Sequence, residues 1–303
     1  MGQHAKAGLG YALFAYFCWG LVPIYLQLTK GIDGFELIGW RVVSSVIVAF
    51  ALVAMTRGWA RMRQVLRSRR DTWTLVIAGH AVLINWTAFV IGVLSDRVLE
   101  TSLGYFLNPL VSVVLAVVFL GERLRPLQWV AVALGAIGVG VMIVGYGEVP
   151  WIGLIVAFSF GTYGLIKKRV GGSVDALSGF TIETTAVLPA SMVMLGIAIT
   201  ANGLTVDATG LTGILGTAGF GIVTAVPLLA FAAATRRIPL TWVAFTQYLA
   251  PIMTFLFGAF VMHEPMPLER WIGFAFVWAS VLLVSLDLVG RQLRRPRPIP
   301  PSA

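Results

Sequence analysis

The sequence predicts an all-α membrane protein with ten transmembrane helices, arranged as two inverted-topology five-helix repeats around a central cavity. Three observations predict this fold: the composition, a series of ten apolar segments, and a second half that repeats features of the first. Of the 303 residues, 58% are hydrophobic and only 12% are charged, and the mean hydropathy is +0.88. Soluble domains carry about 25% charged residues. The chain is therefore expected to cross a lipid bilayer several times.

Ten segments are long and apolar enough to cross the hydrocarbon layer, which takes about twenty helical residues. They are 8–28, 34–56, 72–95, 99–120, 126–145, 150–167, 176–200, 210–234, 240–262 and 268–289. The first span has no small-residue cleavage site after it, so we expect it to be retained. The connections are short except 57–71, and none is long enough to hold a soluble domain. Residues 291–303 are rich in Pro and Arg and are expected to form a disordered basic cytoplasmic tail.

The fourth and ninth predicted spans indicate that the chain is duplicated. The stretch at 102–123, with an Asn-Pro pair and a Gly-Glu exit, is followed by a related stretch at 244–265. At a shift of 142 positions, Pro109 matches Pro251, Glu122 matches Glu264 and Trp129 matches Trp271. Three uncommon residues in the same order at the same spacing favour an internal repeat. We therefore expect a repeat over 1–145 and a second over 146–290.

Basic residues in the connections predict the orientation in the membrane. With a cytoplasmic N-terminus, three basic residues fall outside (Lys30, Arg97 and Arg270) and eighteen fall inside. The inner group is Lys6, Arg57, Arg61, Arg63, Arg67, Arg69, Arg70, Arg123, Arg125, Lys167, Lys168, Arg169, Arg236, Arg237, Arg291, Arg294, Arg295 and Arg297. This excess places both termini in the cytoplasm. Each half holds five spans, an odd number, so the second half is inverted relative to the first.

Charge and chemistry exclude several other classes of protein. The net charge of +9 arises from short loops between apolar spans, which favours membrane orientation and not nucleic-acid binding. One cysteine, Cys18, permits no disulfide framework or thiol metal site, and three scattered histidines form no metal-ligand pattern. No cofactor is expected. The preponderance of Arg over Lys favours a bacterial source, and therefore a multi-pass protein of the bacterial inner (cell) membrane.

Several motifs together resemble the EamA-type permeases of the drug/metabolite transporter superfamily, and most closely the RarD group. The resemblance covers residues 8–290 and is carried by AYFCWGLVPIY (15–25), WRVVSS (40–45), NWTAFV (85–90), LETSLGYFLNPL (99–110), FLGERLRPLQW (119–129), AFSFGTYGLIKK (157–168), IETTAVLP (182–189), IVTAVPLLAFAAATR (222–236) and FTQYLAPIMTFL (245–256). It implies two inverted five-helix repeats and transport of a small metabolite or drug. It does not specify the substrate.

Three ionisable residues inside predicted spans are candidates for charge recognition or coupling. A charge at mid-bilayer costs about 2.5–3.5 kcal/mol, so each needs a reason. Arg41 and Glu183 occupy equivalent positions at the 142 shift. In one interpretation Arg41 attracts anionic substrate groups and Glu183 titrates with a coupling proton; in the other, both steady helix packing. His80 lacks a second ligand at metal spacing, so we expect a packed or weakly hydrogen-bonded histidine, with a proton relay as the alternative.

A second group of polar and aromatic residues predicts a substrate cavity. Proline removes a backbone donor and frees a carbonyl one turn earlier, and a freed carbonyl in lipid needs a wet or polar neighbour. Such prolines lie in the fourth, eighth and ninth spans, and the third span adds the polar pair at 85–86. The fourth and ninth spans are repeat mates, as are the third and eighth, so these groups are expected to converge near the midplane. The candidates are Asn85, Trp86, Tyr105, Asn108, Pro109, Thr224, Pro227, Gln247, Tyr248 and Pro251, with Trp19 and Tyr163 as aromatic walls. Helix kinking and interface anchoring are the structural alternatives.

The sequence favours a secondary active transporter, a permease or exporter, that moves a small metabolite or drug-like solute by alternating access. No nucleotide-binding motif is found, so protons or exchange would supply the driving force. The expected partners are a small-molecule substrate, the lipid bilayer and a proton. The alternatives are an integral-membrane enzyme and a non-transporting channel or scaffold. Against the enzyme, neither SLGYF nor His80 supplies a nucleophile with a buried partner.

Overall fold

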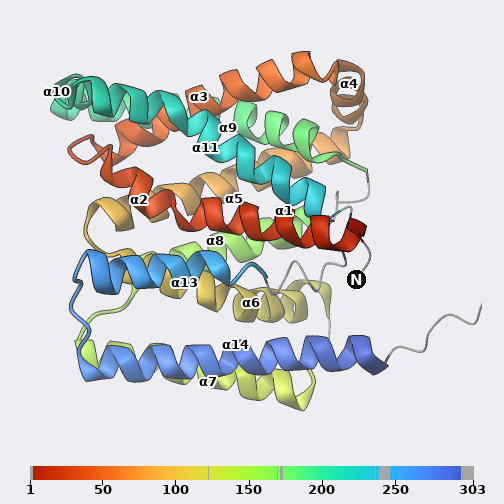
Figure 1. Ribbon diagram of the computed structural model, residues 1–303, viewed down its shortest axis with the longest axis vertical. Coiled ribbons are helices and arrows are strands. Elements are labelled where there is room, and N and C mark those ends of the chain that lie inside the picture. Colours follow the sequence, from red (N-terminus) through yellow and green to blue (C-terminus); the bar gives the residue numbers. More distant parts are fainter. Residues whose placement is uncertain are drawn as a thin grey trace, which may run out of the picture.

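The computed structural model describes residues 3–121, 123–168, 170, 173–235, 237–238 and 246–294. Within these residues every regular element is helical (Figure 1). The elements are α1 (Gln3–Gly20), α2 (Val22–Gln27), α3 (Gly34–Met55), α4 (Trp59–Arg67), α5 (Arg69–Leu94), α6 (Val98–Leu120), α7 (Pro126–Tyr146), α8 (Trp151–Lys168), α9 (Ala176–Asn202), α10 (Thr205–Ala208), α11 (Gly210–Thr235), α13 (Leu249–Leu256), the π-helix η1 (Phe257–Val261) and α14 (Leu268–Arg294).

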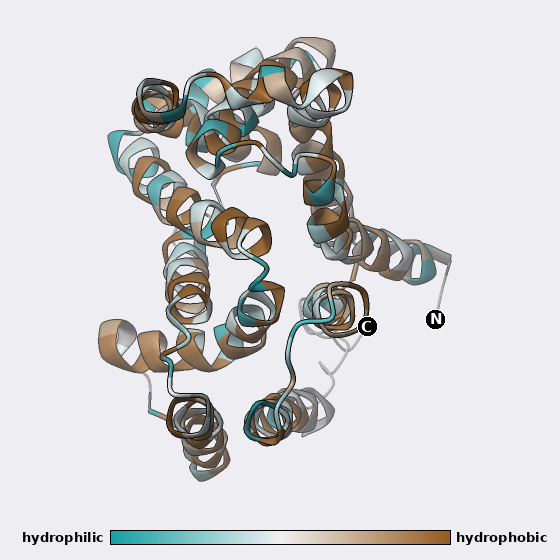
Figure 2. Ribbon diagram, turned by 90° about the vertical axis from the view of Figure 1, so that its left-hand side faces the viewer, coloured by the Kyte–Doolittle hydropathy of each residue, from teal (hydrophilic) through white to brown (hydrophobic). Residues whose placement is uncertain are grey.

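Eight helices in the described part of the chain are long and apolar enough to cross a membrane. The predicted spans 150–167 and 240–262 correspond to shorter apolar helices, Trp151–Lys167 and Leu249–Val261, and residues 240–245 lie outside the described residues. Figure 2 shows that hydrophobic residues predominate along most helices. The structure thus confirms an all-helical, multi-pass membrane protein, and the count of ten spans stays a prediction.

The connection 57–71, which the sequence analysis left without structure, contains helix α4. Met62 and Val65 are buried on one face, whereas its arginines lie on exposed positions. This amphipathic pattern suits a helix that lies along the membrane surface. At the other end of the chain, α14 continues to Arg294, past the boundary at 290 that we predicted for the tail. Residues 295–303 lie outside the described residues.

Helices distant in sequence pack against one another throughout the bundle. α7 lies along α14, and α3 along α9 (Figure 1). α8 packs against both α5 and α6, while α1 and α3 pack against α11. Both described ends of the chain lie at the same edge of the bundle in Figure 1, together with α4, and α10 lies at the opposite edge. The contacts that assemble the molecule therefore run between the two sequence halves.

The start of α3 meets the segment that follows α9, so these two helices run in opposite directions. Glu36 accepts hydrogen bonds from the backbone N–H of Thr205 (2.8 Å) and from that of Val206 (3.2 Å). Thr205 Oγ1 accepts a hydrogen bond from the backbone N–H of Asp33 at 2.8 Å. An antiparallel pair of helices at equivalent sequence positions is the arrangement that an inverted repeat requires.

Several local features recur at the 142 shift. Asp33 caps the N-terminus of α3 and Asp175 that of α9, each accepting from backbone N–H groups of the first turn. Aspartate at this position satisfies donors that have no partner inside the helix. Gly121, after α6, has φ 65°, and His263, after η1, has φ 51°. The motif partner Glu122 lies outside the described residues.

Two glycines at equivalent positions allow close helix contacts. A Cβ added at Gly79 of α5 would lie 2.8 Å from the backbone oxygen of Glu183. One added at Gly221 of α11 would lie 2.4 Å from the backbone oxygen of Ser44. Small residues permit this backbone approach in membrane bundles. These two contacts draw α9 onto α5 and α3 onto α11, which sets the position of the candidate site.

Candidate functional site

Arg41 forms the centre of the candidate site. It lies in α3 and is only 7% exposed. Its guanidinium carbon is 4.5 Å from the ring centroid of Trp86 on α5 and 5.5 Å from that of Phe220 on α11. An arginine over aromatic faces gains a cation–π attraction. Its Nε and Nη1 atoms are buried and have no hydrogen-bond partner among the described residues.

A hydrogen-bonded polar group lies beside this arginine. The Tyr105 hydroxyl of α6 donates to Asn85 Oδ1 at 3.0 Å. Asn85 Nδ2 in turn donates to the carbonyl of Val156 at 3.0 Å and to Ser159 Oγ at 3.3 Å, both on α8. Asn85 and Trp86 are adjacent on α5, and the Arg41 guanidinium lies over the Trp86 ring. The structure thus brings together Arg41, Asn85, Trp86 and Tyr105.

Five further buried polar atoms have no hydrogen-bond partner among the described residues, and two of them, Glu100 Oε2 and Trp278 Nε1, belong to residues that pack among other neighbours. The other three lie on the helices that carry Arg41, Tyr105 and Phe220. They are Ser45 Oγ, one turn after Arg41; Asn108 Oδ1, one turn after Tyr105; and Thr224 Oγ1, one turn after Phe220. A buried polar group without a partner costs free energy and calls for an explanation. Two of the predicted cavity prolines lie inside the same helices: Pro109 follows Asn108 in α6, and Pro227 lies three residues after Thr224 in α11. All three orphaned groups therefore lie on the helices that surround Arg41.

Glu183 occupies a different environment. Its carboxylate accepts from Lys167 Nζ at 2.6 Å and from the Tyr163 hydroxyl at 3.2 Å. The sequence analysis placed Lys167 in a cytoplasmic loop and gave Glu183 no partner. Lys167 belongs to the last turn of α8, four residues after Tyr163, so the two share one helix face. The four-residue spacing of Tyr163 and Lys167 could have indicated that they act together, but only the structure shows that Glu183 is the acid they contact.

The remaining candidates lie in other contacts. Trp19 packs edge-on against Tyr16 (5.1 Å between centroids) and in a tilted arrangement against Phe231 (5.9 Å). Trp19 also contacts the apolar cluster shared by Trp86 and Tyr105, whereas Tyr248 packs against a separate cluster around Phe255. The Pro251 carbonyl accepts from Ser102 Oγ at 2.9 Å, and Gln247 is half-buried. Pro251 thus joins α13 to α6, and among the described residues no hydrogen bond or ring contact links the ninth-span candidates to Arg41.

His80 lies on an exposed face of α5. Its Nδ1 is 2.8 Å from the carbonyl oxygen of Val76, one turn earlier in the same helix. We predicted a packed or weakly hydrogen-bonded histidine; the ring is exposed on the bundle surface and has this one local hydrogen bond. In the part of the chain that the structure describes, no group of three His, Cys, Asp or Glu side chains could hold a metal ion.

Glu264, which the sequence analysis missed as a cap, joins the two halves at the edge of the bundle that also carries α10. Its carboxylate accepts from the backbone N–H groups of Val98 and Leu99 at the start of α6. A carboxylate at a helix N-terminus is favoured by the helix dipole. Burial raises the pKa of Glu264, and the two backbone hydrogen bonds oppose this shift. The glutamate of the His-Glu exit therefore has a structural role in the second half. Its mate in the first half, Glu122, lies outside the described residues.

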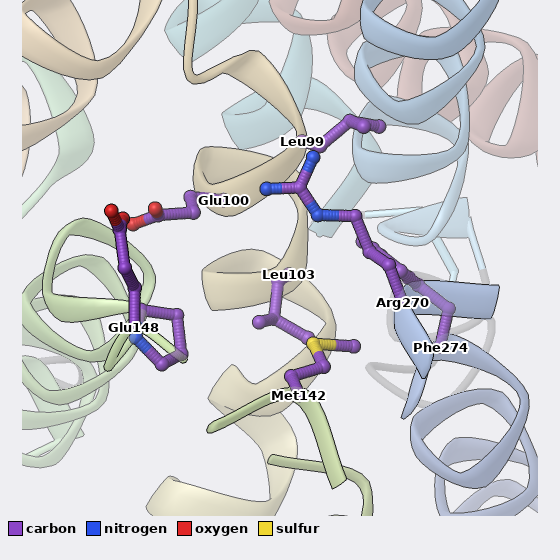
Figure 3. A pocket seen from close by; sticks show the side chains of 8 residues that line it. Leu99, Glu100, Leu103, Met142, Glu148, Arg270 and Phe274 are labelled. Carbon is purple, nitrogen blue, oxygen red and sulfur yellow. The ribbon is translucent and has the colours of Figure 1, made fainter. Parts of the chain in front are cut away.

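A small pocket adjoins this cap (Figure 3). It is lined by Leu99, Glu100, Leu103, Met142, Glu148, Pro150, Arg270 and Phe274. Glu100 and Glu148 extend toward one another in Figure 3, and Arg97 forms ion pairs with both. A second, apolar pocket lies between α4 and α9 and includes Met62 and Ile182. Neither pocket includes Arg41 or Glu183.

Comparisons with known proteins agree with this architecture. The EamA-like transporter family matches twice, over residues 6–144 and 149–286. A RarD protein of Streptomyces exfoliatus is 41% identical over 96% of this chain and 92% of its own. An uncharacterized transporter of Vibrio cholerae is 38% identical over 97% and 98% of the two chains. One solved crystal structure shares the fold, with a TM-score of 0.58 and 18% identity, over 96% of this chain and 99% of the other.

The family match covers nearly the whole chain, and relatives above 30% identity cover almost their full lengths. These relatives carry transporter or RarD names, which accords with the all-helical bundle and its buried polar cluster. The chain therefore belongs to the EamA-like transporter family of the drug/metabolite transporter superfamily and is a multi-pass membrane transporter.

Proposed function

We propose that the protein is a secondary active transporter that moves a small metabolite or drug-like solute by alternating access. The observation that carries this proposal is the set of buried polar atoms without partners around Arg41. A bundle that only had to be stable would satisfy or omit these groups, because unpaired polar atoms away from water are costly. Their position among α3, α5, α6 and α11 fits a solute site that is completed when the solute binds.

We further propose that two inverted repeats, 1–145 and 146–290, supply the two conformations. The matching caps at Asp33 and Asp175 and the matching close contacts at Gly79 and Gly221 support this division. Two halves related by an axis in the membrane plane can exchange conformations, which gives outward-open and inward-open states of similar energy. The site near Arg41 would then face each side in turn.

The driving force is either exchange of solutes or movement of a proton. Glu183 is the carboxylate through which a proton would couple. Its pairing with Lys167 and Tyr163 supports the structural interpretation of this residue. Exchange requires no titration of Glu183 and is therefore the simpler mechanism for this arrangement.

A flux experiment tests the proposal. The purified protein is placed in liposomes loaded with a mixture of metabolites, and efflux of each is measured with and without external solute and with and without a pH gradient. Stimulation by external solute is the expected result for exchange. Catalysis without translocation would make the protein an enzyme, and ungated conductance would make it a channel. Asn108→Ala and Glu183→Gln probe the site, and Ile84→Ala, on the exposed surface of α5, is the control.

The inverted arrangement has its own test. Single cysteines are introduced at Arg125 and at Pro265, both exposed and separated by nearly the repeat shift, in a Cys18→Ser background. Labelling with a membrane-impermeant maleimide in intact cells and in inverted vesicles reports the side of each position. We expect Arg125→Cys to react from the cytoplasm and Pro265→Cys from outside. Reaction of both from one side would overturn the inverted repeat.

A further inference from the structure

We propose that Arg41 binds the carboxylate of a monoanionic solute whose apolar or aromatic body packs beside Trp86 and Phe220. This inference rests on the proposed transport function and names the class of solute. It begins with the chemistry of the guanidinium, which has five N–H donors and no acceptor and stays charged in proteins. Three of those donors, one on Nε and two on Nη1, have no partner among the described residues.

The surroundings of Arg41 supply no counter-charge. Among the described residues, the ion pairs join Lys30 with Asp96, Arg97 with Glu100 and Glu148, Arg125 with Asp287, and Lys167 with Glu183; none includes Arg41. A cation this deeply buried is normally paired, because desolvation of an isolated charge is very costly. The two aromatic faces offset part of that cost but accept no hydrogen bond. The missing partner is therefore an anion with acceptor oxygens.

The neighbouring groups restrict what that anion can be. One arginine without a second cation matches a single negative charge, which favours a carboxylate over a phosphate dianion. A carboxylate offers two oxygens that accept from guanidinium N–H groups. Next to the charge lie the faces of Trp86 and Phe220, which favour an apolar or planar body. Asn108 Oδ1, one turn after Tyr105 on α6, and Thr224 Oγ1, one turn after Phe220 on α11, are buried acceptors that a donor on the solute could satisfy.

The comparison with Glu183 strengthens the assignment. Arg41 and Glu183 are equivalent at the 142 shift and are similarly buried, at 7% and 4% exposure. Glu183 has its cation, Lys167, at 2.6 Å within the same half of the chain. The protein therefore supplies a counter-ion to Glu183, whereas no described residue forms an ion pair with Arg41. For Arg41 the counter-ion has to come with the solute.

Equilibrium binding to the purified protein in lipid nanodiscs, measured by calorimetry, tests the inference without requiring transport. The probes are pairs that differ only in charge: indole-3-acetate with indole-3-acetamide, and phenylacetate with phenylacetamide. We expect the acids to bind the unaltered protein at least tenfold more tightly than the amides. Arg41→Met should remove this preference, and Arg41→Lys, which keeps the charge but loses the planar fork, should retain part of it. Ile84→Ala should bind as the unaltered protein does.

Each result decides the matter. Equal binding of acids and amides, or acid binding unchanged in Arg41→Met, would overturn the inference, as would competition by chloride alone at the same strength. Monodisperse elution and an unchanged helical circular dichroism spectrum of Arg41→Lys show that its binding result reports the site and not misfolding. Charge-selective binding through Arg41 with no flux of any solute would overturn the proposed function and leave the inference standing. Flux of neutral solutes that is unaffected by Arg41→Met would do the reverse.

Discussion

Arg41 and Glu183 occupy the same position in the two halves of the chain and have opposite charges and opposite surroundings. Glu183 is held by Lys167 and by Tyr163, both from α8. Arg41 lies between two aromatic rings and leaves two nitrogen atoms without hydrogen bonds. Both are nearly fully buried. The two sites therefore differ in whether the protein itself completes them.

The difference shows how two positions related by the 142 shift can take separate tasks. A buried ion pair fixes the packing of the helices that carry it, because separating the two charges would leave each one unpaired in a low-dielectric interior. An unsatisfied buried cation instead leaves binding energy for a partner from outside. The Glu183 region is thus suited to link α8 to α9 through side chains, and the Arg41 region is suited to bind a solute. Removing a charge from the Glu183 region should therefore change stability more than removing one from the Arg41 region.

Removal of the cation beside Glu183 should have the largest effect on stability. We expect Lys167→Met to lower the free energy of unfolding by about 3 kcal/mol, because the buried carboxylate loses its counter-ion. Glu183→Gln should cost less, since Lys167, which is 29% exposed in its side chain, can extend toward the interface. Steric-trapping measurements in lipid bicelles would give both values. A Lys167→Met protein as stable as the unaltered one would show that the pair does not hold the helices.

The two equivalent glycines should come next. Gly79→Ala places a methyl group 2.8 Å from the Glu183 carbonyl oxygen, and Gly221→Ala places one 2.4 Å from that of Ser44. Each should destabilise by about 1–3 kcal/mol, because packed backbone has to move apart, with Gly221→Ala the more severe. Gly196→Ala is the matched control, as nothing lies within 4 Å of its added methyl group. Thermal denaturation in detergent would rank the three, and equal stabilities would refute the close contacts.

Replacement of Arg41 should affect stability least among the buried charges. We expect Arg41→Met to leave the free energy of unfolding unchanged within about 1 kcal/mol or to raise it, because an uncompensated charge is replaced by an apolar chain of similar length. The same protein should lose solute-dependent stabilisation. Denaturation with and without indole-3-acetate measures both. A loss of stability as large as that of Lys167→Met would mean that Arg41 has a structural partner after all.

Glu264 offers a third kind of buried carboxylate, satisfied by backbone amides and not by a cation. Its pKa is raised mainly by burial. The folded state therefore binds a proton more readily than the unfolded state, so this stabilising contribution is present at low pH and is lost as the pH rises through the raised pKa. We expect a small decrease in melting temperature from pH 4.5 upward. Glu264→Gln, whose amide oxygen still accepts from Val98 and Leu99, should flatten that decrease, and an unchanged slope would assign it to other groups.

Much of the architecture could be predicted because it depends on local properties. Composition and the lengths of apolar segments indicated the membrane class, and the spacing of Pro109 and Pro251 indicated duplication. Asn85, Trp86 and Tyr105 were identified as polar or aromatic residues that a lipid-exposed face would not carry. The structure brings them together with Arg41. Helix α4 could also have been found, because Met62, Val65 and Leu66 repeat at helical spacing.

The sequence by itself determined that this chain forms membrane helices, which connections carry the positive charge, and which residues are too polar to face lipid. These follow from residue type and chain order alone. The tertiary structure decided that Glu183 meets Lys167, that the Arg41 guanidinium lies over Trp86 and Phe220, and that Glu264 caps α6. The physical reason is that a membrane helix is apolar over most of its surface, so its few polar residues indicate an inward face but not the helix that packs against it. Only the packing of one helix on another selects each buried charge's neighbours.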